Sequence, residues 1–133
     1  MPEIPPEEFD VVVLGGGPGG YAAALYGASA GMRIAIVEED RMGGTCLNRG
    51  CIPAKELLQT AEVFRTVKGA AEFGVHTTSP SIELSETQTR KQAVVDRLVG
   101  GLETLLKGRK VTTFPGTGTL GADGRRASAR RRS

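Results

Sequence analysis

The sequence predicts a doubly wound α/β fold, and three neighbouring features predict it. An apolar run, "DVVVL" at 10–14, leads into the glycine-rich stretch "GGGPGG", and a second apolar run, "RIAIV", follows at 33–37. The segment between them is rich in alanine and glycine and has helical composition. Strand, glycine turn, helix and strand together have the size of one βαβ unit, in which the two strands are parallel.

Each element of this unit has its own sequence signal. The run at 10–14 is continuously apolar, which is typical of a strand covered on both faces. Small residues dominate the helix that follows, so it is expected to lie close to the sheet, and Gly31 is expected to end it. The second strand ends at an acidic pair, Glu38 and Glu39.

Further elements follow the unit. Pro53 is expected to open a helix through about Lys68, because proline is favoured in the first turn. Next come a loop at 74–83 and a helix from about Glu86 to Lys107, and Gly108 is expected to cap this helix. A strand at 110–114 and a turn-rich stretch at 115–124 follow. The apolar faces of the two helices are predicted at Leu57, Ala61, Phe64 and Val67, and at Val94, Val95, Leu98, Leu102 and Leu105.

Length and charge narrow the class of protein. A chain of 133 residues is long enough for one domain. Five of its 17 basic residues lie in the last nine positions, which leaves 12 basic and 15 acidic residues in 1–124, so the body is mildly acidic. We therefore expect no nucleic-acid partner. The apolar runs are too short to span a membrane, and the acidic, proline-rich start does not resemble a signal peptide, so a cytoplasmic location is predicted.

The glycine-rich stretch satisfies the pattern G-x-G-x-x-G at Gly15, Gly17 and Gly20. The first glycine permits a tight turn, the second lets a pyrophosphate approach the backbone, and the third permits close contact between helix and strand. The following helix start offers free N–H groups to phosphates. The predicted phosphate-binding loop consists of Gly15, Gly16, Gly17, Pro18, Gly19 and Gly20.

An acidic partner supports a dinucleotide ligand for this loop. Glu38 ends the second strand 23 residues after Gly15, where a carboxylate accepts hydrogen bonds from a ribose hydroxyl. We include its neighbour Glu39 in the predicted site. A glycine turn without a ligand is the alternative, and the pattern itself does not distinguish FAD from NAD.

The two cysteines, Cys46 and Cys51, have three conceivable roles. For zinc, the pair supplies two ligands and His76 is the only histidine, so no metal site is predicted. A structural disulfide would close a very short loop in a reducing compartment. A redox-active dithiol fits the local sequence better, since Cys51 lies at a helix start, where the helix dipole favours a thiolate.

A bond between these cysteines requires the chain to bend back. Disulfides need Cα atoms about 4.4–6.8 Å apart, whereas five residues of helix rise about 7.5 Å. Asn48 and Gly50 are expected to permit the bend, because both tolerate unusual backbone angles.

The stretches "GGTCLNRGCIPAK" and "VVVLGGGPGGYAAA" closely resemble the flavin-dependent pyridine nucleotide–disulfide oxidoreductases. Leu47, Ile52 and the segment 100–111 are more similar to the dihydrolipoamide dehydrogenase branch than to the glutathione or mercuric reductases. The resemblance covers roughly residues 9–122. It implies the N-terminal part of a Rossmann-like doubly wound FAD-binding domain.

The resemblance also implies roles for individual residues. Cys46 would exchange with the dithiol substrate, and Cys51 would lie against the flavin and form the charge-transfer contact. Two positions depart from the family pattern, because Arg49 replaces the common valine and Ala54 the common serine. The remaining residues implied at the FAD site are Gly44, Thr45, Cys46, Lys55 and Gly118.

The resemblance implies partners and cofactors of a whole enzyme. The cofactors are FAD, and NAD on a domain absent here. The partners are dihydrolipoamide or a lipoyl-domain protein of a 2-oxoacid dehydrogenase complex. The family forms homodimers, but this short sequence does not itself support a dimer. The predicted division is a leader at 1–9, the FAD-binding portion at 10–124, and a basic tail at 125–133 that is disordered or the product of a frameshift. The alternatives are an inactive truncated product, a nucleotide-binding module, or another reductase of the family.

Overall fold

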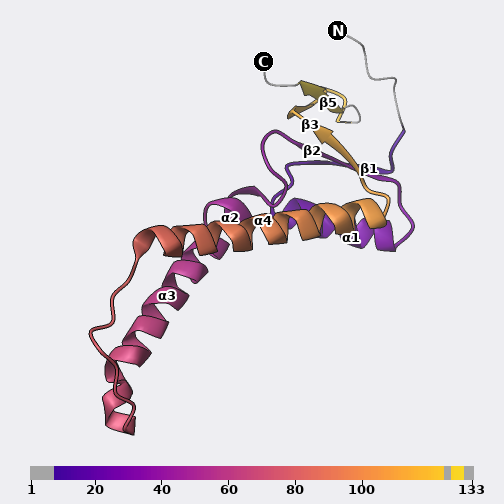
Figure 1. Ribbon diagram of the computed structural model, residues 1–133. Coiled ribbons are helices and arrows are strands. Elements are labelled where there is room, and N and C mark those ends of the chain that lie inside the picture. Colours follow the sequence, from indigo (N-terminus) through magenta and orange to yellow (C-terminus); the bar gives the residue numbers. More distant parts are fainter. Residues whose placement is uncertain (1–7, 125–126, 131–133) are drawn as a thin grey trace.

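A three-stranded parallel sheet with helices on one face is the centre of the fold (Figure 1). The computed structural model describes residues 8–124 and 127–130. In chain order the elements are β1 (Val11–Leu14), α1 (Pro18–Ser29), β2 (Ile34–Glu38), α2 (Gly44–Asn48), α3 (Cys51–Gly69), the 3₁₀ helix η1 (Ala70–Phe73), α4 (Leu84–Gly108), β3 (Thr112–Pro115), β4 (Thr117–Leu120) and β5 (Ala127–Arg130).

The predicted βαβ unit is confirmed. Strands β1 and β2 are parallel with Val13 opposite Ile36, and α1 connects them. Strand β2 also pairs in parallel with β3, which places Ile36 opposite Thr113. The sheet order is therefore β1-β2-β3, with the most buried strand in the middle, and the fold class is α/β as predicted.

The predicted burial of the first strand is wrong. Val11, Val12 and Leu14 are 42%, 37% and 41% exposed. Within the described residues β1 pairs with β2 alone, so it lies at an edge of the sheet. Continuous apolar sequence predicts a strand here correctly, but it does not reveal which neighbours cover the strand.

The core lies between the sheet and two helices. In Figure 1, α1 and the C-terminal half of α4 lie under the sheet, and their side chains Ala24, Leu102 and Leu106 belong to one buried cluster with Ile34 and Ile36 of β2. Residues alternate between the faces of a strand, so Val37 points to the opposite face. There the short hairpin of β4 and β5 covers the sheet.

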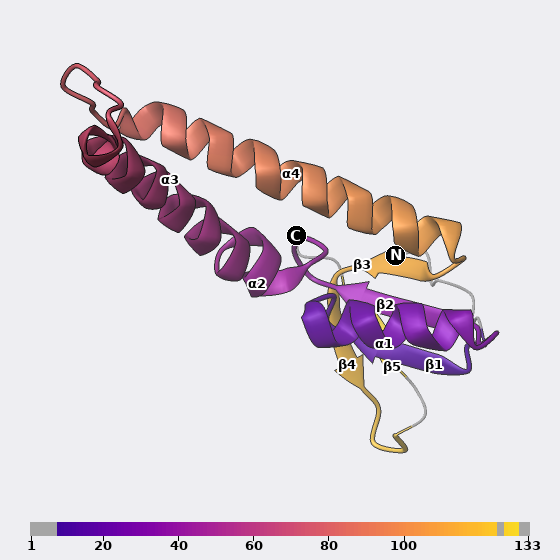
Figure 2. The ribbon, with the colours of Figure 1, turned by 90° about the horizontal axis from the view of Figure 1, so that it is seen from below.

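Helix α3 and the N-terminal half of α4 form an arm that extends away from the sheet (Figure 2). No residue of α3 is buried, and its predicted apolar face is at best half-buried, with Leu57 38% exposed. In α4 the predicted face is rotated. Val95 and Leu102 are buried as predicted, but Leu98 and Leu105 are 39% and 46% exposed, and Val99 and Leu106 are buried in their place.

The C-terminal segment adds one strand. Residues 127–130 form β5, antiparallel to β4, and β4 itself lies in the stretch that the sequence predicts as turn-rich. The rest of the predicted tail, residues 125–126 and 131–133, and residues 1–7 of the predicted leader lie outside the described part, so the division into leader, domain and tail stays a prediction. Among the described helices, none has the length and apolar character that crossing a membrane requires.

Candidate functional site

The carboxyl ends of the parallel strands bring the predicted site residues to one edge of the sheet. Strand β1 leads into the glycine loop, and β2 ends at Glu38. Backbone hydrogen bonds connect these ends, because Gly15 N–H donates to the Val37 carbonyl at 2.8 Å and Gly116 N–H to the Glu38 carbonyl at 2.8 Å. This edge is where open α/β sheets bind their ligands.

The glycine loop has the geometry that its pattern predicts. Gly15 has φ of +100°, which favours glycine, and forms the turn. A Cβ on Gly20 would lie 1.9 Å from the Gly15 carbonyl oxygen, so α1 and the loop approach too closely for any side chain. Gly17 caps α1, and around Gly19 no atom lies within 4 Å of a Cβ position.

The first turn of α1 is suited to an anion. No side chain caps the helix, its first turn contains no acidic residue, and Pro18 occupies a position where no N–H is needed. The remaining N–H groups of a helix start have no partner inside the helix and carry a partial positive charge. The loop therefore fits the pyrophosphate of a dinucleotide.

Glu38 holds the loop from the neighbouring strand. Its Oε2 accepts a hydrogen bond from Gly16 N–H at 2.6 Å, and its Oε1 accepts one from Asp40 N–H at 2.9 Å. Each carboxylate oxygen has a second lone pair, which leaves capacity to accept a ribose hydroxyl. Sequence reasoning finds the carboxylate but not its bond to the loop.

The other predicted residues at this edge have mainly structural contacts. Glu39 accepts a hydrogen bond from Thr117 Oγ1 at 3.1 Å, which ties the end of β2 to β4. A Cβ on Gly118 would lie 2.7 Å from a methyl group of Leu14 and 3.1 Å from one of Val37. Glycine is thus required there for β4 to lie on the sheet.

Cys46 and Cys51 form a disulfide with their Cα atoms 4.6 Å apart. Cys46 lies in the short helix α2 and is half-buried, whereas Cys51 is the first residue of α3 and is exposed. Helix α3 thus begins two residues before the predicted Pro53. The bond lies at the start of a 19-residue helix whose first turn has no acidic residue, an environment that stabilises a thiolate on Cys51 after reduction.

The expected cause of the bend is wrong. Asn48 and Gly50 do not adopt positive φ, and Gly50 has φ of −122°. Asn48 acts through its side chain instead, since its Nδ2 donates to the carbonyls of Met42 at 3.1 Å and Gly44 at 3.0 Å. A Cβ on Gly50 would lie 3.2 Å from the Thr45 carbonyl, so glycine permits a close approach of the chain to α2.

The cysteine segment touches the glycine loop directly. Gly43 N–H donates to the Gly16 carbonyl at 2.8 Å, and a Cβ on Gly44 would lie 2.7 Å from Gly17 Cα. Gly43 and Gly44 both have positive φ, at +100° and +59°. Local sequence patterns do not reveal this contact, because it joins residues 27 positions apart.

Charged pairs surround the cysteine segment. Arg49, between the two cysteines, is ion-paired with Asp40, which follows β2. Arg41 donates to Asp96 of α4 at 3.0 Å. Hydrogen bonds from Gln92 and from Arg41 lower the pKa of Asp96 below its ordinary value. These pairs connect the end of β2 to both α2 and α4.

Lys55 and His76 lie apart from these contacts. Lys55 is exposed on α3, one turn after Cys51, and lines a groove of about 900 Å³ between α3 and α4. His76 is exposed in the loop that follows η1. In the described ranges no three His, Cys, Asp or Glu side chains form a group suited to a metal ion.

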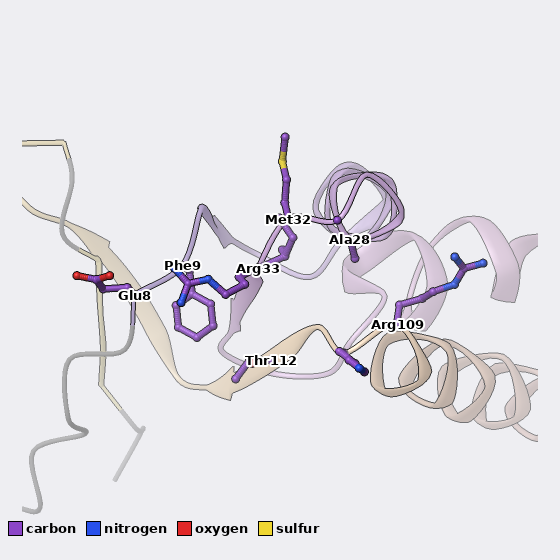
Figure 3. A pocket seen from close by; sticks show the side chains of 10 residues that line it. Glu8, Phe9, Ala28, Met32, Arg33, Arg109 and Thr112 are labelled. Atoms are coloured by element: carbon purple, nitrogen blue, oxygen red, sulfur yellow. The ribbon is translucent and has the colours of Figure 1, made fainter.

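A cavity of about 540 Å³ lies at the opposite end of the sheet (Figure 3). Figure 3 shows Glu8 and Phe9 on one side of it and Arg109 on the other. Its basic residues are Arg33, which follows the C-terminal end of α1, and Arg109 and Lys110, which follow that of α4, where a positive charge offsets the carbonyl dipoles. This cavity is far from the strand ends that carry the predicted site.

Comparisons with known proteins agree with this arrangement. A family model for pyridine nucleotide-disulphide oxidoreductases matches residues 9–131. Dihydrolipoyl dehydrogenase of Bacillus subtilis is 50% identical over 113 residues, which are 85% of this chain and 24% of that protein. The enzymes of the same name from Chlamydia muridarum and Acholeplasma laidlawii are 47% and 43% identical over 86% of this chain, which covers 24% and 34% of their lengths. The chain thus spans about a quarter to a third of these relatives.

Proposed function

Since the chain belongs to the pyridine nucleotide-disulphide oxidoreductase family, we propose that it carries the redox disulfide and the first half of the FAD site of a dihydrolipoyl dehydrogenase. The observation that carries this proposal is the Cys46–Cys51 disulfide directly beside the glycine loop, with Gly44 against Gly17. The activity of the whole enzyme, oxidation of dihydrolipoamide with NAD⁺, requires the longer protein.

The residues present fit FAD. In the proposal the loop from Gly15 to Gly20 holds the pyrophosphate with the free N–H groups of α1, and Glu38 accepts the ribose hydroxyls. Gly44, Thr45, Cys46 and Lys55 line the path toward the reactive ring. Gly118 and Glu39 contribute by keeping β4 against the sheet end, since one lies on Leu14 and the other accepts from Thr117.

The chemistry of this chain is dithiol–disulfide exchange. A thiolate of the substrate attacks Cys46 Sγ, a mixed disulfide forms, and the Cys46–Cys51 bond breaks with Cys51 leaving as a thiolate. The second sulfur of the substrate then displaces Cys46, so the substrate leaves as a disulfide. The Cys46–Cys51 pair has gained two electrons in total and is now a dithiol. FAD, when bound, supplies the acceptor for these two electrons, and NAD⁺ is the final acceptor.

The helix start at Cys51 supports this order of attack. A leaving thiolate departs faster when it is stabilised, and Cys51 lies where the dipole of α3 stabilises negative charge. Cys46, in the middle of α2, has no such advantage. The proposal therefore assigns substrate exchange to Cys46 and the contact with the flavin to Cys51.

The finer parts of the proposal concern partners and location. The names of the relatives support a dihydrolipoamide substrate. From the family resemblance we propose that a lipoyl-domain protein of a 2-oxoacid dehydrogenase complex carries it. We also propose a cytoplasmic location and, for the longer protein, a homodimer. A nucleotide-binding module without catalytic activity is the rival for this 133-residue chain.

The visible absorption spectrum of the purified chain tests the proposal. A flavin band at about one FAD per chain, before or after FAD is added, is expected if the glycine loop and cysteine segment suffice for binding. Gly17→Glu is the control, because a carboxylate at the loop would repel the pyrophosphate. A chain that retains no FAD at any concentration would contradict the proposed FAD site for this chain.

A further inference from the structure

Asn48, in the short helix that carries Cys46, is bonded to the segment that touches the glycine loop. Its Nδ2 donates two hydrogen bonds, to the carbonyl oxygens of Met42 and Gly44, at 3.1 and 3.0 Å. Met42 precedes α2 and Gly44 is its first residue, whereas Asn48 is its last residue. The side chain thus connects the last residue of the helix to its start, and Cys46 lies between Gly44 and Asn48.

The amide of Asn48 is enclosed. Its Oδ1 is buried and has no hydrogen-bond partner among the described residues. Solvent therefore does not reach this oxygen, and the two bonds that Nδ2 makes are part-buried. A buried oxygen without a hydrogen-bond partner lowers the stability of the fold, so a specific role is expected for the residue that carries it.

Helix α2 needs such a support. It has only five residues, no side chain caps its start, and a helix this short is not stable by itself. Its backbone hydrogen bonds from Leu47 N–H to Gly43 and from Arg49 N–H to Thr45 are correspondingly few. The Asn48 side chain adds two bonds to the same short segment.

From these contacts we infer that Asn48 is a positioning residue that sets how readily the Cys46–Cys51 disulfide is reduced. The inference rests on the proposed function in taking this pair as the redox pair. In the reduced chain Asn48 keeps α2 folded and holds the Cys46 thiol beside Cys51. Two thiols that are held together re-form their bond more readily, so the Asn48 amide stabilises the disulfide relative to the dithiol.

Equilibration of the 133-residue chain with glutathione buffers measures this effect. Two glutathione thiols give up two electrons and become glutathione disulfide, while the Cys46–Cys51 bond accepts two electrons and two protons. Trypsin cleaves after Arg49, so Cys46 and Cys51 fall on separate peptides when they are reduced and alkylated. The fraction of linked and separated peptides gives the equilibrium constant.

Asn48→Ala is expected to lower the stability of the disulfide about tenfold, which corresponds to a midpoint about 30 mV less negative. The matched control is Thr104→Ala, because Thr104 Oγ1 also donates to a backbone carbonyl, that of Gly100 at 2.8 Å, on an exposed part of α4. The control should leave the midpoint unchanged. A folded Asn48→Ala chain with an unchanged midpoint would overturn the inference.

A second measurement uses the unaltered chain and does not depend on the folding of a variant. Asn48 is the only asparagine, so selective ¹⁵N labelling gives one side-chain amide signal. In the reduced chain this NH₂ group should exchange with water much more slowly than the same group does when the chain is unfolded in urea. Equal exchange would show that Asn48 does not hold α2 when the thiols are free, and the inference would fall. Neither measurement requires FAD, so a chain that binds no flavin still gives a decisive result.

Discussion

Gly44, two residues before Cys46, lies against Gly17, the residue that caps the helix of the glycine loop. A Cβ on Gly44 would come within 2.7 Å of Gly17 Cα and 3.3 Å of Gly17 N. The neighbouring bond from Gly43 N–H to the Gly16 carbonyl, at 2.8 Å, fixes the same junction. The proposed phosphate-binding loop and the redox disulfide are therefore parts of one contiguous structure.

Gly44→Ala should separate these two segments. Gly74→Ala is the matched control, because both glycines have positive φ, at +59° and +74°, but no atom lies within 4 Å of a Cβ at Gly74. Both variants carry the cost of a left-handed backbone, about 1 kcal/mol. Gly44→Ala alone adds a collision with backbone, and overpacking of this kind typically costs about 1–3 kcal/mol.

Urea unfolding of the oxidised chain measures the difference. The free energy of unfolding of Gly44→Ala is expected to fall about 2 kcal/mol further than that of Gly74→Ala. Bound FAD, where the unaltered chain retains it, should be lost in Gly44→Ala and kept in Gly74→Ala. Equal stability of the two variants would mean that the contact between Gly44 and Gly17 can adjust to a methyl group with no loss of unfolding free energy.

Gly20→Ala should destabilise the chain more severely than its neighbour Gly19→Ala. A methyl group on Gly20 would lie 1.9 Å from the Gly15 carbonyl oxygen, which is a backbone atom, so the turn or α1 would have to shift. The cost is expected to be at least about 2 kcal/mol. Gly19 faces open space within α1, so alanine there should stabilise the helix by up to about 1 kcal/mol.

Thermal unfolding of both variants, followed by circular dichroism, checks whether the two substitutions change the stability in opposite directions. The unfolding midpoint should rise in Gly19→Ala and fall in Gly20→Ala. A similar change in both would contradict the assignment of the third glycine to contact between helix and strand.

Much of the fold is predictable because its signals are local. The apolar run of β2 predicts a buried strand, and Ile34 to Val37 are all buried. The spacing of the three glycines predicts the turn at Gly15 and the close contact at Gly20. The cysteine motif predicts a redox pair from two residues and their surroundings. Each of these inferences depends on fewer than about 30 consecutive residues, the length of one βαβ unit.

The missed features depend on partners that lie far apart in the sequence. Burial of β1 depends on which strands flank it, and its own apolar residues do not determine that. The buried face of α4 differs from the predicted one because the sheet and α1 select Val99 and Leu106 over Leu98 and Leu105. The sequence selects Asn48 for its backbone, but the residue acts through its side chain, and its two carbonyl partners become visible only when residues 42–44 are placed.

Asp40 is expected to suppress the effect of Arg49 on the cysteines. Arg49 lies between Cys46 and Cys51, and its ion pair with Asp40 offsets its charge. Asp40→Asn leaves Arg49 unpaired beside the reduced thiols, and a nearby cation favours the reactive thiolate. The rate of alkylation by iodoacetamide at pH 7 should rise about two- to threefold, since both partners are exposed and solvent screens the charge.

Two controls accompany this measurement. Glu62→Gln releases Arg65 from its ion pair on α3 in the same way, but away from the cysteines, and should leave the alkylation rate unchanged. The double variant Asp40→Asn, Arg49→Val should return the rate to that of the unaltered chain or below it. A rate in Asp40→Asn that does not fall with added salt would argue against an electrostatic cause.

Asp96 should make the connection between α4 and the end of β2 sensitive to acid. Hydrogen bonds from Gln92 and from Arg41 lower its pKa in the folded chain. A lowered pKa means that the stabilisation is fully present above the ordinary carboxylate pKa of about 4 and is lost as the pH falls through the lowered value. Asp96→Asn should therefore unfold at a lower temperature than the unaltered chain at pH 6, and the difference should shrink steadily below pH 4.

Glu103→Gln is the control, because Glu103 lies on the same helix and has no hydrogen bond or ion pair in the described residues. Its difference in unfolding temperature from the unaltered chain should not shrink at low pH. Thermal unfolding midpoints of the three chains between pH 6 and pH 2.5 test this, and a difference that stays constant across that range would exclude Asp96 as the titrating group.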